Sequence, residues 1–180
     1  MKIWGLTDRG TVREQNQDTF HLWKEDNTAA LLVCDGMGGA RAGNVASALA
    51  VQAFTEAIQH SDAQPEARLT AALAQANEQV YQRAHQDPDC RGMGTTLVAA
   101  LVEGNVAHII NVGDSRAYYL SQNGIRQITI DHSLVQDLLQ RGHITPEEAR
   151  NHPNKNVITR ALGVDSKLEG DLFTQELEPG

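Results

Sequence analysis

The fold is decided by the stretch Leu31-Leu-Val-Cys-Asp35-Gly36-Met-Gly38-Gly39, in which an apolar run ends in a carboxylate and a glycine-rich turn. The run begins at Ala29, and its continuous hydrophobicity predicts a strand that is buried on both faces. An amphipathic helix is expected after the turn, over 44–60. We therefore expect Asp35 at the rim of a sheet, where hard divalent cations take oxygen ligands, and glycine at position 36 lets its carbonyl approach the same ion.

Strands are predicted on both sides of a pair of helices. The first strands are expected at 2–7 and 19–23, and a second helix at 65–85, with Pro65 in its first turn. Asn123-Gly124 predicts a hairpin turn. The later strands are expected at 95–102, 106–112, 117–120, 125–130, 157–162 and 171–177. Strands, then helices, then strands favour an α+β fold over a parallel βαβ sheet.

The length of the chain predicts one domain. With 180 residues, of which 41% are hydrophobic, the chain can bury one substantial core but is short for two, so we expect a single domain over 1–180. Within it, the segment at about 131–155 changes character and is expected to form a surface flap subdomain. It contains a short helix over 133–141, Gly142 as a stop, and Thr145-Pro-Glu-Glu148 as a capped helix start.

Composition excludes several classes of protein. The net charge of −8 disfavours binding to nucleic acid or to an anionic membrane, because basic clusters are the usual electrostatic signature of both. Cys34 and Cys90 are far apart and have no Cys-x-x-Cys partner, which excludes a zinc ribbon and a dense disulfide framework. The sequence has neither an apolar run of about 18 residues nor a signal-peptide pattern, so we expect a cytoplasmic protein.

Two further motifs carry charged side chains near the ends of predicted strands. Arg13-Glu-Gln-Asn-Gln-Asp18 places a guanidinium, whose planar fork suits phosphate oxygens, five residues before a carboxylate. Asn111-Val-Gly-Asp114-Ser-Arg116 is a tight turn with a carboxylate at its apex. Taken singly, each is explained by a surface ion pair or an ordinary turn, and the same holds for Asp35. Their occurrence together is what indicates a site.

Jointly, these motifs resemble those of the metal-dependent PP2C-type (PPM) protein serine/threonine phosphatases, especially the compact bacterial members. The resemblance covers essentially the whole chain and extends to Gly92-Met-Gly-Thr-Thr96, Asp131-His132-Ser133 and Val157-Ile-Thr-Arg-Ala-Leu-Gly163. It implies an α-β-β-α sandwich of antiparallel sheets flanked by helices. It also implies hydrolysis of phosphoserine and phosphothreonine in proteins, with a cognate serine/threonine kinase pathway. Within these motifs, His132 is expected to be a structural histidine rather than a proton donor.

The resemblance implies a role for each candidate residue. Asp35 would bridge two divalent ions, Mn²⁺ or Mg²⁺, and the Gly36 carbonyl would join one of them. Asp18 would bind directly or orient a metal-bound water. Asp114 would hold a third, weaker ion, and Arg13 would bind the substrate phosphate. Two ions about 3.5–4 Å apart activate a bridging water and offset phosphoryl charge, so no cysteine or serine nucleophile is needed.

The sequence departs from this family near its C-terminus. Family members carry two further aspartates, in Ser-Asp-Gly and Asp-Asn, whereas the last aspartates here, Asp165 and Asp171, are followed by neither Gly nor Asn. The sequence ends at Glu178-Pro-Gly180, so we expect a C-terminally truncated fold, weakened ion affinity and weak activity. The alternative is a catalytically inactive phosphatase-like module that binds a phosphoprotein or signalling partner. A two-metal phosphodiesterase or nuclease is disfavoured by the net charge of −8 and the absence of a basic groove.

Overall fold

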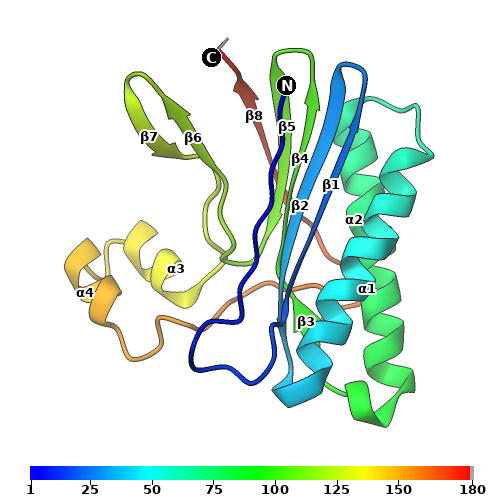
Figure 1. The fold of residues 1–180 in the computed structure, drawn as a ribbon. Coiled ribbons are helices and arrows are strands. Elements are labelled where there is room, and N and C mark those ends of the chain that lie inside the picture. The colour runs from blue at the N-terminus through cyan, green and yellow to red at the C-terminus, as the bar shows by residue number, and fades with distance from the viewer. Residues whose placement is uncertain (179–180) are drawn as a thin grey trace.

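The computed structural model describes residues 1–178, except for the side chains of 39–41. Pro179 and Gly180, the last two residues of the expected domain, lie outside the described residues. One large antiparallel sheet has the order β1-β2-β4-β5-β8, with the short β3 paired to β2, and β6 and β7 form a separate two-stranded sheet (Figure 1). The strands of the large sheet are β1 (Asp18–Glu25), β2 (Thr28–Met37), β3 (Gly94–Thr95), β4 (Leu97–Glu103), β5 (Val106–Val112) and β8 (Asp171–Glu176). The α+β class with antiparallel pairing is confirmed.

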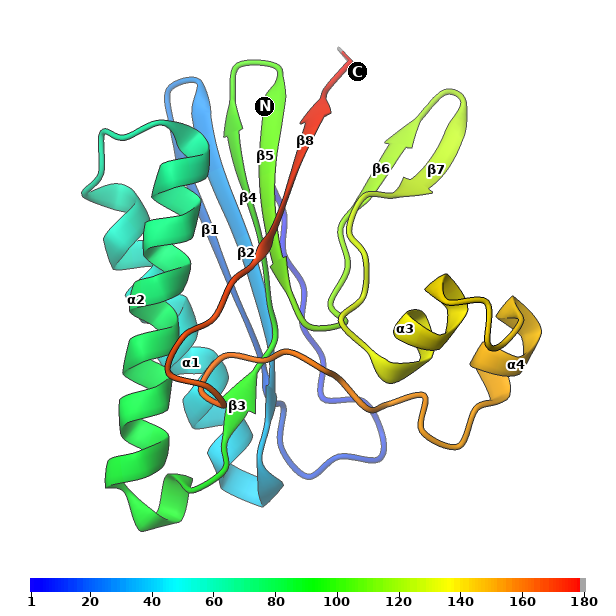
Figure 2. The same ribbon diagram turned by 180° about the vertical axis from the view of Figure 1, so that it is seen from behind.

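Two long helices, α1 (Gly39–Gln59) and α2 (Pro65–Gln86), cover one face of the large sheet (Figures 1 and 2). Both predicted helices are confirmed, although α1 begins at Gly39 rather than at 44. None of the described helices is long and apolar enough to cross a membrane. The largest fully buried side chains of the core between helices and sheet include Phe54, Ile58, Leu69, Leu73, Leu97, Leu101 and Ile110.

The opposite face of the sheet carries the N-terminal segment (Figure 1). Residues 1–9 form no strand, so the strand predicted at 2–7 is wrong. The segment lies across the face instead of pairing with a strand edge, and Gly5 sits so close to the Phe20 ring that a Cβ there would be 2.2 Å from it. Val33 is 45% exposed on this face, so the predicted burial of β2 on both faces is also wrong. Helices cover β2 on one side only.

The strand predicted at 157–162 is wrong as well. Because the chain leaves the flap region there and crosses toward α2, it makes only two isolated bridges, Ser133↔Ile158 and Thr95↔Leu162. The buried Asn77 of α2 fixes the crossing. Its side-chain amide donates to the Asp165 carbonyl at 2.9 Å, and its Oδ1 accepts from the Gly163 N–H at 2.9 Å. We call 157–163 the return segment.

The hairpin and the flap region lie away from the α1–α2 layer (Figure 2). The strands β6 (Tyr118–Ser121) and β7 (Gly124–Gln127) confirm the hairpin predicted at Asn123-Gly124. The helix α3 (Leu134–Gln140) is capped by Ser133, and α4 (Pro146–Asn151) begins with a capping box between Thr145 and Glu148. Both helix starts are confirmed. That 131–155 acts as one flap subdomain stays a prediction.

Candidate functional site

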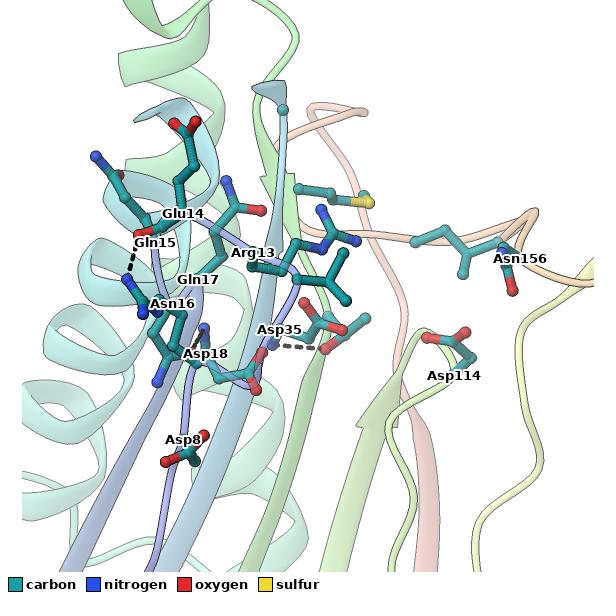
Figure 3. Close-up of a pocket in the computed structure, with 17 residues that line it drawn as sticks. Asp8, Arg13, Glu14, Gln15, Asn16, Gln17, Asp18, Asp35, Asp114 and Asn156 are labelled. Atoms are coloured by element: carbon teal, nitrogen blue, oxygen red, sulfur yellow. Dashed lines mark hydrogen bonds between the residues drawn. The ribbon is translucent and has the colours of Figure 1, made fainter. Parts of the chain in front are cut away.

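A cavity of about 860 Å³ opens where the polar end of β2 meets the loop before β1 (Figure 3). The turn after β5 and the return segment complete its wall, the latter through Ile158. The cavity brings together all the residues singled out from the sequence: Arg13, Asp18, Asp35, Gly36 and Asp114. Segments far apart in the sequence therefore converge on one concave site.

Asp18 and Asp35 form the acidic floor of this cavity. They are partners in the β1–β2 ladder, and opposite residues of such a ladder carry side chains about 5 Å apart on one face. Loss of hydration and then the negative charge of Asp18 raise the pKa of Asp35 to about 6. Asp114 adds to this rise in pKa, whereas Arg13 opposes it. Carboxylates that repel in this way favour the binding of a proton or a cation.

The backbone of Asp35 is fixed by two threonines. The Asp35 N–H donates to Thr96 Oγ1 at 2.9 Å, and the Thr96 N–H donates to the Asp35 carbonyl at 3.0 Å. Thr95 Oγ1 also donates to that carbonyl at 3.0 Å. Thr96 lies at the break between β3 and β4 and is 3% exposed. The sequence marked the Gly-Met-Gly-Thr-Thr motif but indicated no role for this hydroxyl.

Thr96 also supports the turn that carries Asp114. Its Oγ1 lies 2.6 Å from the hydroxyl of Ser115. Gly113 has a φ of 101°, and a Cβ at that position would be 2.6 Å from Thr96 Cγ2. Glycine is therefore required in this turn for both its backbone conformation and its close packing. One buried threonine thus connects the two segments that present Asp35 and Asp114.

Gly36 lies where β2 approaches α1 closely. Its N–H donates to the Gln17 carbonyl at 3.0 Å, and a Cβ on Gly36 would be 1.9 Å from the Gly43 carbonyl oxygen. No other residue type fits this approach. Gly36 also lines the cavity, but its role as a carbonyl ligand stays a prediction.

Arg13 and Arg116 differ in their surroundings. Arg13 is exposed, and Figure 3 places it beside Asp35 in the cavity wall. Arg116 instead binds the buried Asp131, with Nε at 2.8 and 3.0 Å from its two carboxylate oxygens and Nη2 at 2.5 Å from Oδ2. Arg116 is therefore a partner for an acid, and it fixes the turn after β5 to the segment that precedes α3.

Neither cysteine is available as a nucleophile. Cys34 and Cys90 are both free and buried. Burial strongly raises the pKa of the Cys34 thiol, which keeps it in the unreactive protonated form. Ser115 has Thr96 as its hydroxyl partner. The site therefore offers neither cysteine as a nucleophile, and the Ser115 hydroxyl is already engaged with Thr96.

The acidic groups do not form a closed metal cage within residues 1–178. No three histidine, cysteine, aspartate or glutamate side chains of this part lie close enough together to hold one ion. Asp18 and Asp35 are adjacent, whereas Asp114 stands across the cavity from them (Figure 3). The arrangement offers two neighbouring oxygen ligands and a separate third one.

Comparison with known proteins identifies relatives along nearly the whole chain. Residues 9–146 match the family model described as protein phosphatase 2C. The serine/threonine phosphatase Stp of Listeria welshimeri is 45% identical over 173 residues, which are 93% of this chain and 69% of that protein. The crystal structure of Stp1 from Staphylococcus aureus superposes with a TM-score of 0.90 at 40% identity, covering 96% of this chain and 70% of that one. The catalytic domain of PstP in complex with two manganese ions gives a TM-score of 0.81 at 38% identity, covering 96% and 71%.

Proposed function

The chain belongs to the protein phosphatase 2C family, and from this premise we propose that it hydrolyses phosphoserine and phosphothreonine in proteins. The observation that carries the proposal is the convergence of Asp18, Asp35, Asp114 and Arg13 on a single cavity. A cavity of about 860 Å³ is large enough for a phosphorylated side chain and its flanking residues. Phosphoproteins are the substrates that this family relationship supports.

We assign the acidic residues to divalent cations, Mn²⁺ or Mg²⁺. The fit rests on the raised pKa of Asp35, because a carboxylate destabilised by a like charge gains most from a cation between the two groups. Asp18 and Asp35 would hold the principal ions together with the Gly36 carbonyl, and Asp114 would hold a third. Bound ions supply an activated water and offset the charge of the phosphoryl oxygens.

Arg13 and Thr96 have different supporting roles in the site. The guanidinium of Arg13 offers paired N–H donors to two phosphate oxygens. Thr96 holds the Asp35 backbone in place, so that the carboxylate is presented without reorganisation. Preorganised groups of this kind are the main way a protein accelerates phosphoryl transfer.

Weak activity of the 180-residue chain remains part of the proposal. Because no three acidic or histidine side chains of residues 1–178 share one coordination sphere, we expect low ion affinity. The inactive phosphoprotein-binding module stays the alternative. A cognate kinase pathway and a location in the cytoplasm also remain predictions.

Turnover of a phosphothreonine peptide by the purified chain, with and without Mn²⁺, tests the function. Manganese-dependent release of phosphate that disappears in Asp35→Asn supports the enzyme. Peptide binding without turnover, unchanged in Asp35→Asn, supports the module. Asp62→Asn serves as the matched control, because Asp62 is exposed in the connection between α1 and α2, outside the cavity lining.

A further inference from the structure

His132 lies beneath the turn that carries Asp114 and contacts it twice. The Gly113 N–H donates to Nδ1 of His132 at 3.1 Å. In the opposite direction, the His132 N–H donates to the Gly113 carbonyl at 2.9 Å. His132 is 4% exposed, so both contacts are shielded from water. The residue immediately before Asp114 is therefore held at both of its backbone polar groups.

The contact with Gly113 determines the state of the imidazole ring. Because Nδ1 accepts a hydrogen bond from a backbone N–H, it carries no proton, and the proton of the neutral ring is on Nε2. Nε2 lies 3.1 Å from Asp171 Oδ2, although its N–H direction is off the line of a good hydrogen bond. Asp171 also accepts a hydrogen bond from Arg160 Nη1 at 2.8 Å. The side of the ring opposite Gly113 thus faces a carboxylate that also pairs with Arg160.

The backbone of His132 extends this connection to the flap region. Its carbonyl accepts from the Thr159 N–H at 2.8 Å, and the next residue, Ser133, forms a bridge with Ile158. The two chain segments that enter and leave 134–157 therefore meet at His132. One buried residue joins the base of the flap region, the start of β8 and the Asp114 turn.

Direct participation in chemistry does not fit this geometry. His132 is absent from the residues that line the cavity in the described part of the chain. Its Nδ1 is occupied by Gly113, and its Nε2 faces Asp171 on the other side. Neither nitrogen is available to a substrate oxygen or to a metal ion.

We propose that His132 is a positioning residue, which holds the Asp114 turn through the unprotonated Nδ1 and aligns it with the base of the flap region. The proposal rests on the proposed role of Asp114 as a metal ligand. Among the described contacts, His132 Nδ1 is the acceptor for the Gly113 N–H, whereas Asn111 contacts the same residue as a donor, from Nδ2 to the Gly113 carbonyl. Positioning by a group outside the site is a common way to tune ligand affinity.

Two matched variants of the 180-residue chain test the proposal. His132→Asn keeps a side-chain acceptor close to the place of Nδ1, whereas His132→Gln moves its amide toward the place of Nε2. Both variants lose the ring and its packing, so a purely structural role predicts similar effects. We expect amide hydrogen exchange at Gly113, measured by NMR in chelator-treated protein, to be about tenfold faster in His132→Gln than in His132→Asn.

Manganese dependence gives the second measurement. We expect His132→Gln to need about 10–100-fold more Mn²⁺ for half-maximal turnover than His132→Asn, with KM for the phosphopeptide changed much less. If the unmodified chain shows no manganese-dependent turnover, the proposed function of the chain fails. The exchange rates at Gly113 still decide whether His132 positions the turn, so the two failures are distinguishable.

The tautomer of His132 in the unmodified protein is decisive even if neither variant folds. We expect the ¹⁵N spectrum of the imidazole to show a protonated Nε2 and an unprotonated Nδ1. A protonated Nδ1 would overturn the proposal. Equal exchange rates at Gly113 in the two variants would overturn it as well.

Discussion

Asp18 and Asp35 face each other across the β1–β2 ladder, at the end of the sheet where the cavity opens. The pairing raises the pKa of Asp35 from 3.8 to about 6, through lost hydration and then the charge of Asp18. The folded protein therefore holds this proton more tightly than the unfolded chain does. Stability from this group is fully present below pH 3.8 and is lost as the pH rises through about 6.

The first prediction concerns the stability of the chelator-treated protein. We expect Asp35→Asn, which cannot ionise, to unfold at a higher temperature than the unmodified protein at pH 7.5. The difference should shrink when both are measured at pH 4. Thermal unfolding in EDTA at the two pH values checks this, with Asp62→Asn as a control that should show no such change. A lower melting temperature for Asp35→Asn at pH 7.5 would contradict the raised pKa.

Asp35→Asn, although expected to raise the melting temperature, should lower the affinity for metal ions. We expect Asp35→Asn and Asp18→Asn each to lower the affinity for Mn²⁺ by about 100-fold or more, because removing a charged oxygen ligand removes several kcal/mol of interaction. Asp114→Asn should cost less, since Asp114 stands apart from the other two carboxylates (Figure 3). Calorimetric titration with Mn²⁺ measures all three. Equal losses in the three variants would argue against a separate, weaker third ion.

The hydroxyl of Thr96 should contribute to stability as well as to the site. Thr96→Val keeps the shape of the side chain but leaves the Asp35 N–H without its partner and removes the contact with Ser115. We expect a loss of ~1–3 kcal/mol in the free energy of unfolding, measured by urea denaturation. Thr96→Ser keeps the hydroxyl and should preserve the hydrogen bonds while losing only the methyl contact with Gly113. If Val and Ser variants are destabilised equally, packing rather than hydrogen bonding dominates at this position.

The sequence indicates the ends of strands more reliably than it indicates their partners. The sequence places Asp35 at a strand end, because an apolar run followed by Asp-Gly predicts a strand and then a turn from adjacent residues alone. Thr96 holds Asp35 from 61 residues away, and no local pattern contains that pairing. The segments 2–7 and 157–162 fail as strands for a related reason. Ala161 and Leu162 are buried without joining a ladder, and Trp4 and Leu6 are exposed, so the apolar residues of neither segment indicate strand pairing.

Arg13 should bind the substrate phosphate through the paired N–H donors of its guanidinium and not only through its charge. We expect Arg13→Lys to weaken binding of a phosphothreonine peptide by about 10–100-fold in the presence of Mn²⁺, because one charged hydrogen bond of the pair is lost. Arg13→Ala should weaken it further. Arg9→Ala is the matched control, since Arg9 lines the same cavity but its Nη1 donates to the Glu14 carbonyl at 3.2 Å. Calorimetry with phosphorylated and unphosphorylated peptide separates phosphate recognition from contacts with the flanking residues. An Arg13→Lys variant that binds as tightly as the unmodified chain would show that charge alone suffices. An equal effect of Arg9→Ala would show that Arg9 contributes to phosphate binding as much as Arg13 does.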